Sequence, residues 1–141
     1  MINASERVIF DPAGSWHHPQ MPERNDVLYG ATPALEAYFT SYHARETYYV
    51  ISQKILVPAA VAEHALTLSK TAGPVRQSLC TRATSTLLSK LSGFESISPV
   101  FFPEKLEEKF SKLPNVERIE LREDDSDDNR AVLRNPQRVA L

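Results

Sequence analysis

Cys80 is the one cysteine of this 141-residue chain, and its position makes it a candidate nucleophile. It stands at the start of a segment whose apolar residues recur at helical spacing, namely Ala83, Leu87, Leu88 and Leu91. At a helix N-terminus, the helix dipole and the unpaired backbone amides favour the nucleophilic thiolate. The same amides can form an oxyanion hole. The alternative is structural, because a lone cysteine beside apolar residues is more often a small buried side chain.

A cysteine nucleophile needs a base, and the chain contains four histidines. His17 and His18 follow the first predicted strand in an expected loop, where functional residues concentrate. His43 and His64 fall within helical patterns, where a surface or packing role is commoner. Asp11 ends the first predicted strand and could orient a histidine, as the third member of a catalytic triad does. Its alternative role is to cap the turn that follows.

The composition excludes several classes of protein. Hydrophobic residues make up 42% of the chain and charged residues 24%, which is ordinary for a globular protein. The formal net charge of -2 leaves no basic footprint for nucleic acid. No apolar run approaches the roughly 18 residues of a membrane-spanning helix, so no transmembrane segment is expected. The first residues, MINASERVIF, do not resemble a secretory signal, and we expect synthesis in the cytoplasm.

No motif predicts a metal or a cofactor. A single cysteine excludes an internal disulfide and a cysteine-based zinc cluster. The acidic run from Asp124 to Asp128 resembles a calcium loop only superficially, because an EF-hand requires Gly at its sixth position and Glu at its twelfth. Counted from Asp124, those positions hold Asn129 and Asn135. Phosphate-binding glycine loops and HExxH or GxSxG motifs are also missing from the sequence.

The elements that would position Cys80 and Asp11 form an α+β pattern. Thr32 is an expected N-cap, with Pro33 in the first helical turn. Residues 12–30 contain three prolines and little periodicity, and are expected to form a long surface loop. Strands are predicted over residues 7–11, 47–56 and 116–121, and helices over residues 32–43, 58–69, 80–91 and 103–113.

These elements predict one domain over residues 1–123, in which a small antiparallel sheet packs with about four helices. The predicted sheet contains all three strands. Residues 124–141 are acidic and offer few apolar side chains to bury, so a mobile tail is expected there.

Three stretches of the sequence are similar to a known family. VIFDPAGSW (residues 8–16) resembles the strand and turn of papain-like cysteine hydrolase domains found in bacterial polymorphic toxins and secretion-system effectors. SLCTRATSTLLSKLSGF (78–94) is similar to their Cys-Thr/Ala-x-x-x-Ser-x-x-Leu helix, and FFPEKLEEKF (101–110) to the Pro-x-x-Leu helix that follows. These domains are related to NlpC/P60 enzymes in a permuted order, with histidine ahead of cysteine. The similarity spans residues 8–116.

The resemblance implies a papain-like fold in which Cys80 attacks an amide or ester and forms a thioester. It implies His17 or His18 as the base and Asp11 as the orienting group. In the family, however, the catalytic histidine usually lies in a strand ahead of the stretch matching residues 1–11, and here no histidine precedes His17. Three interpretations follow: an N-terminally truncated piece, a role taken over by His17 or His18, or an inactive domain.

The resemblance also implies a biological setting of bacterial competition or virulence, with export by a specialised secretion system. The substrate would be a peptide, a protein or a lipid ester, and a cognate immunity protein or a chaperone would be a partner. The rival interpretation is a non-catalytic interaction module, such as a degenerate hydrolase, an adaptor or an immunity-type protein. A third is an accessory domain of a larger toxin.

Overall fold

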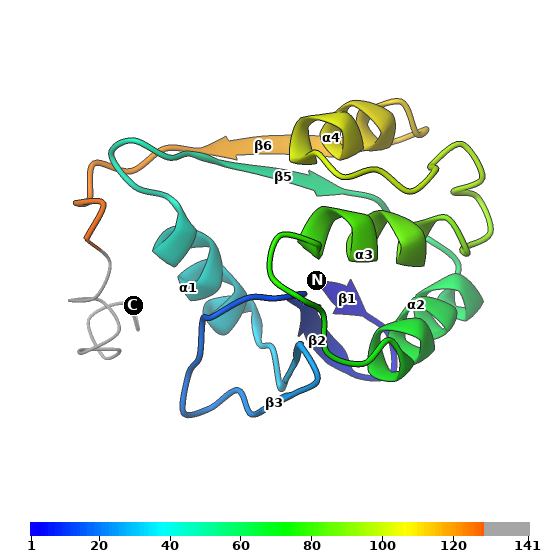
Figure 1. Cartoon of the computed structure of the whole chain (residues 1–141), viewed down its shortest axis with the longest axis horizontal. Helices are drawn as coiled ribbons and strands as arrows, with labels where there is room; N and C mark the ends of the chain where they lie inside the picture. Colours follow the sequence, from blue (N-terminus) through cyan, green and yellow to red (C-terminus); the bar gives the residue numbers. More distant parts are fainter. Residues whose placement is uncertain (129–141) are drawn as a thin grey trace.

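The computed structural model describes residues 1–128 and confirms the α+β class. Within these residues the chain forms four helices and two separate antiparallel sheets (Figure 1). Residues 129–141, most of the predicted tail, lie outside the described residues.

The first sheet has four short strands in the order β1-β2-β4-β3. Their bounds are Ile2–Asn3 for β1, Arg7–Phe10 for β2, Glu23–Arg24 for β3 and Val27–Tyr29 for β4. The prediction of a long surface loop over residues 12–30 is therefore wrong. This segment contains β3 and β4, and its Trp16 and Met21 are buried. The overlooked signal is the pair Asn25 and Asp26, whose φ angles of 50° and 62° suit the two-residue hairpin turn that joins the strands.

The two faces of this sheet are covered by different helices. Ile9 and Leu28 pack against α1 (Pro33–His43), which begins where the Thr32 hydroxyl accepts the Leu35 N–H at 3.2 Å. Val8 and Val27 point to the opposite face, where they meet α2 (Ala59–Thr71). Because side chains alternate along a strand, this short sheet separates α1 from α2.

The second sheet consists of β5 (Val50–Lys54) and β6 (Glu117–Leu121). Both strands were predicted, but the prediction that they share a sheet with β2 is wrong. Successive contacts run from β1 to α2, then to α3 (Cys80–Leu88), to α4 (Pro103–Ser111) and to β5. In Figure 1, α3 lies between the two sheets, with α2 beside the first sheet and α4 beside the second. Their shared core contains Ala65, Leu87, Leu91, Phe94, Ile97 and Leu113.

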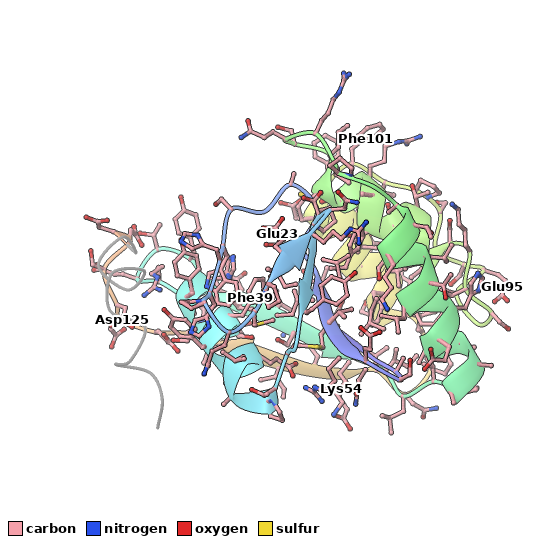
Figure 2. All side chains as sticks on the ribbon, turned by 90° about the horizontal axis from the view of Figure 1, so that it is seen from below. Glu23, Phe39, Lys54, Glu95, Phe101 and Asp125 are labelled. Atoms are coloured by element: carbon pink, nitrogen blue, oxygen red, sulfur yellow. The ribbon has the colours of Figure 1, made fainter. Side chains whose placement is uncertain are left out.

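Asp125 and Asp127, in the described part of the acidic segment, contact residues 45–47 in the loop between α1 and β5. The Glu46 N–H donates to the Asp125 carbonyl at 2.8 Å, and the Thr47 hydroxyl donates to the Asp127 carboxylate at 2.5 Å. Arg45, only 4% exposed, places its guanidinium 3.6 Å from the Asp125 carboxylate. Figure 2 shows Asp125 at the periphery, on the side of α1.

Ser85 connects α3 to the chain that leads into α4. Its fully buried hydroxyl accepts the Val100 N–H at 2.9 Å and lies 3.2 Å from the Val100 carbonyl oxygen. Ser85 is also the serine of the motif that resembles the nucleophile helix. This hydroxyl gives the Val100 amide a hydrogen-bond partner, so the serine of the motif has a structural role in this chain.

We expect Ser85→Ala to lower the free energy of unfolding by about 1 to 3 kcal/mol, because the half-buried Val100 amide loses its partner. Urea denaturation measures this change. The matched control is Ser111→Ala, which removes an exposed hydroxyl bonded to the Glu108 carbonyl. It should change the stability by less than about 0.5 kcal/mol. Equal losses in the two variants would contradict the role given to Ser85.

Candidate functional site

Cys80 is the first residue of α3, and its side chain is exposed. The helix starts abruptly, because Ser78 has a positive φ of 68° and Leu79 provides no side-chain cap. The first helical hydrogen bond runs from the Ala83 N–H to the Leu79 carbonyl at 2.9 Å. As predicted, the thiol lies at a helix N-terminus.

Asp11 lies at the end of β2 in a tight turn, which the Gly14 N–H closes by donating to the Asp11 carbonyl at 3.0 Å. The Asp11 carboxylate folds back over Gly14: a Cβ at position 14 would lie 1.8 Å from Asp11 Oδ2. This close approach explains why the turn needs glycine there. Burial raises the pKa of Asp11, and the nearby imidazole of His43 acts in the opposite direction.

Asp26 joins the Asp11 turn to the loop that leads into α3. One oxygen of its carboxylate accepts the Ala13 N–H at 3.2 Å and the Val75 N–H at 2.7 Å. Its backbone carbonyl accepts the Asp11 N–H at 2.8 Å. The segments that carry Asp11 and Cys80 are distant in sequence, and these bonds make them neighbours (Figure 1).

His18 is held within the aromatic cluster beneath α1. Its ring stacks on Trp16, with 5.9 Å between centroids, and meets Tyr38 edge-on at 5.5 Å. Burial lowers the pKa of His18. Its Nδ1 accepts the Gln20 N–H at 3.1 Å, which occupies that lone pair and leaves the proton on Nε2. The ring is therefore a donor at Nε2, and a general base would need a free lone pair there.

His17 is exposed, and its Nδ1 lies 3.5 Å from the Ser15 carbonyl oxygen, a long contact. The polar contact of Cys80 Sγ is with Thr81 Oγ1 at 3.9 Å, and no histidine in residues 1–128 makes a hydrogen bond to the sulfur. The structure thus places His17 and His18 in the loop after β2, without joining them to Cys80.

His43 is the histidine whose imidazole acts electrostatically on Asp11. It lies at the end of α1, where its Nδ1 is 2.7 Å from the Phe39 carbonyl oxygen. A carbonyl can only accept, so Nδ1 carries the proton and the Nε2 lone pair is free. This is the tautomer that a general base needs. From the sequence alone, its helical position suggested a surface or packing role, and the side chain is exposed. The sequence did place His43 as a basic residue in the last turn of the predicted helix, a position that the helix dipole favours.

A groove of about 350 Å³ runs between the end of α2 and α3, close to the start of the Cys80 helix. Its wall is mainly apolar, with Arg82 and Lys90 as its basic groups. Leu79 and Arg82, which flank Cys80 in the sequence, both line it. The groove therefore offers room for the apolar part of a ligand near the thiol.

Within the described part of the chain, no three His, Cys, Asp or Glu side chains are placed to hold a metal ion. None of the helices in residues 1–128 has both the length and the apolarity to cross a membrane. In comparisons with known proteins, no family model, no curated protein and no solved structure matches the chain.

The buried carboxyl of Asp11 predicts a specific pH dependence of stability. Its folded-state pKa is raised above the ordinary 3.8, so its contribution to stability is fully present below pH 3.8 and is lost as pH rises through the folded-state pKa. Asp11→Asn removes this titration. The stability of the variant relative to the natural protein should therefore increase as pH rises from about 3.8, as measured by urea denaturation at several pH values.

Asp127→Asn is the control, because the pKa of Asp127 is shifted in the opposite direction to that of Asp11. Hydrogen bonds from Thr47 lower the pKa of Asp127, so its stabilisation is present above pH 3.8 and is lost as pH falls through the lowered pKa. The Asn variant should lose stability relative to the natural protein as pH rises. A flat difference for Asp11→Asn would show that its carboxyl is not buried in the folded state.

Asp26→Gly tests the link between the Asp11 turn and α3. Glycine tolerates the positive φ at this position, so the substitution removes the carboxylate without backbone strain. The Ala13 and Val75 amides then lose their acceptor, and the free energy of unfolding should fall by at least about 1 kcal/mol. Asp26→Asn keeps an acceptor oxygen and should lose much less. Equal losses in the two variants would contradict this role.

Proposed function

We propose that this chain is a papain-like cysteine hydrolase domain that cleaves an amide or ester bond through a thioester on Cys80. One observation carries the proposal: the Asp26 carboxylate joins the turn that holds Asp11 to Val75, in the loop that leads to the exposed Cys80 thiol at the start of α3. The segments with the family-like motifs are therefore adjacent in the fold. This adjacency supports the sequence resemblance.

In the proposed reaction, the Cys80 thiolate attacks the carbonyl carbon of the substrate. The amides of Thr81 and Arg82 precede the first helical hydrogen bond and can donate to the developing oxyanion. The tetrahedral intermediate collapses to a thioester, and the leaving amine or alcohol takes a proton from an imidazolium. Water then attacks the thioester, which releases the acid and regenerates the thiol.

The base in this proposal is an imidazole, and His43 is the preferred candidate. Its Nδ1 carries the proton, which leaves the basic lone pair on Nε2, and its charge acts on Asp11. His18 has its Nδ1 occupied and its ring packed against Trp16. His17 remains the exposed alternative from the sequence.

The biological setting of the proposal rests on the sequence resemblance. It is a bacterial toxin or effector, made in the cytoplasm and exported by a specialised secretion system. Its substrate would be a peptide, protein or lipid ester, and its partner an immunity protein or a chaperone. The groove beside α3 supports a substrate with an apolar part.

The second candidate is a non-catalytic interaction module. It is favoured by the missing hydrogen bond between Cys80 and any described histidine, and by exposed aromatic rings ahead of α4. Phe101 is 55% exposed and Phe102 is 68% exposed, and the Arg82 guanidinium lies 4.7 Å from the Phe101 ring. Exposed aromatic rings beside arginine are typical of protein-binding surfaces.

Thiol reactivity separates the two candidates. We expect iodoacetamide to alkylate Cys80 at about pH 6 at least roughly tenfold faster than an ordinary exposed thiol, which is almost wholly protonated there. The reference thiol is a cysteine placed at exposed Ser111 in a chain that carries Cys80→Ala. Mass spectrometry of the modified chain measures both rates. Equal rates would favour the interaction module.

Hydrolysis of p-nitrophenyl acetate and of a peptide library gives the activity readout. Cys80→Ala should abolish turnover with little change in melting temperature, because the side chain is exposed. His17→Ala, His18→Ala and His43→Ala, made singly, identify the base by loss of turnover. The expected result is that His43→Ala has the largest effect. Turnover that survives Cys80→Ala would reject the proposal.

A further inference from the structure

The outer edge of β6 has no backbone partner within residues 1–128. β6 pairs with β5 alone, from Val50 opposite Leu121 to Lys54 opposite Glu117. In Figure 1, β6 lies along the upper side of the molecule beside α4, and no other described strand lies beyond it. An unpaired edge presents a row of free N–H and C=O groups, so it can accept a further strand.

The open face of the sheet of β5 and β6 carries three apolar side chains among three polar ones, namely Val50, Ile119 and Leu121 among Ser52, Lys54 and Glu117. The other face of the sheet meets α4, where the Gln53 side chain donates to the Glu107 carbonyl at 3.2 Å. On the open face, Ile119 is 65% exposed at the centre of β6. A two-stranded sheet is marginally stable by itself, and a longer sheet would stabilise it.

The sequence of β6, Glu-Arg-Ile-Glu-Leu, is charge-complementary to a second antiparallel copy of itself. When two copies align with the two-fold axis at Ile119, the two isoleucines face each other. On either side of the axis, Arg118 of one copy lies opposite Glu120 of the partner subunit. Opposite charges and β-branched pairs stabilise directly opposed positions. Alignments centred on Arg118 or on Glu120 would instead place like charges at the dyad, which is unfavourable.

We propose that β6 is a self-association strand, through which two copies of this chain form a continuous four-stranded sheet in the order β5-β6-β6-β5. The interface is isologous, as in most protein dimers. In the single chain, Arg118 lies 3.3 Å from Glu107 and 3.6 Å from Glu120. These pairs are exposed and contribute little, so Arg118 can exchange them for the partner at small cost. Cys80 and Asp11 take no part, so this proposal is independent of the hydrolase function.

Charge reversal tests both the interface and its register. Sedimentation equilibrium of the full chain over a range of concentrations should show a dimer. Arg118→Glu alone and Glu120→Arg alone should each yield monomers, because like charges then oppose each other across the dyad. The double variant R118E/E120R should recover the dimer. Arg24→Glu, an exposed position on the edge strand β3 of the other sheet, is the matched control and should leave the dimer intact.

Disulfide trapping gives a second readout that does not depend on charge. Residues directly opposed in an antiparallel pair have Cα atoms about 4.5 to 5.5 Å apart, which a disulfide can bridge. In a chain that carries Cys80→Ala, Ile119→Cys should therefore form a crosslinked dimer under mild oxidation. Ser52→Cys lies opposite Ile119 on β5, away from the proposed interface between the two β6 strands, and should not crosslink.

Several results would overturn the proposal. These are a natural chain that is monomeric at every concentration, a dimer that persists in Arg118→Glu, or a double variant that stays monomeric. Equal crosslinking at positions 119 and 52 would also overturn it. Thermal unfolding of each variant distinguishes loss of association from loss of folding.

Discussion

The Asp26 carboxylate is the contact on which the arrangement of the candidate site depends. It accepts amides from the turn after β2 and from the loop before α3, two segments that share no strand pairing. It reaches both because Asn25 and Asp26 adopt positive φ angles in the tight turn between β3 and β4. A local backbone conformation thus determines a tertiary connection, and through it the position of the Cys80 thiol.

In the turn after β2, each residue of one short motif has a different structural role. Gly14 leaves room for the Asp11 carboxylate, Pro12 is buried, and Trp16, 2% exposed, anchors the following loop beneath α1. Burying a carboxylate costs free energy, and the raised pKa of Asp11 expresses that cost. A position that is unfavourable for stability yet built into a tight turn is typical of functional sites.

The two sheets serve separate purposes in this fold. The four-stranded sheet is covered on both faces by helices and holds the turns around Asp11 and Asp26. The sheet of β5 and β6 is covered on one face by α4 and keeps an open edge, with Ile119 exposed. The candidate active site and the proposed association surface therefore lie on different elements. Substitutions on different elements can therefore test the proposed catalysis and the proposed association separately.

The sequence by itself determined the elements with local signals. The Thr32-Pro33 cap and Pro103 define helix starts, because capping and backbone conformation depend on neighbouring residues. The position of Cys80 at a helix start followed in the same way. Only the tertiary structure decided that β2 and β6 belong to different sheets, and that the charge of His43 acts on Asp11 while His18 stacks on Trp16. These outcomes depend on packing between distant segments, and periodicity along the chain carries no information about which segments meet.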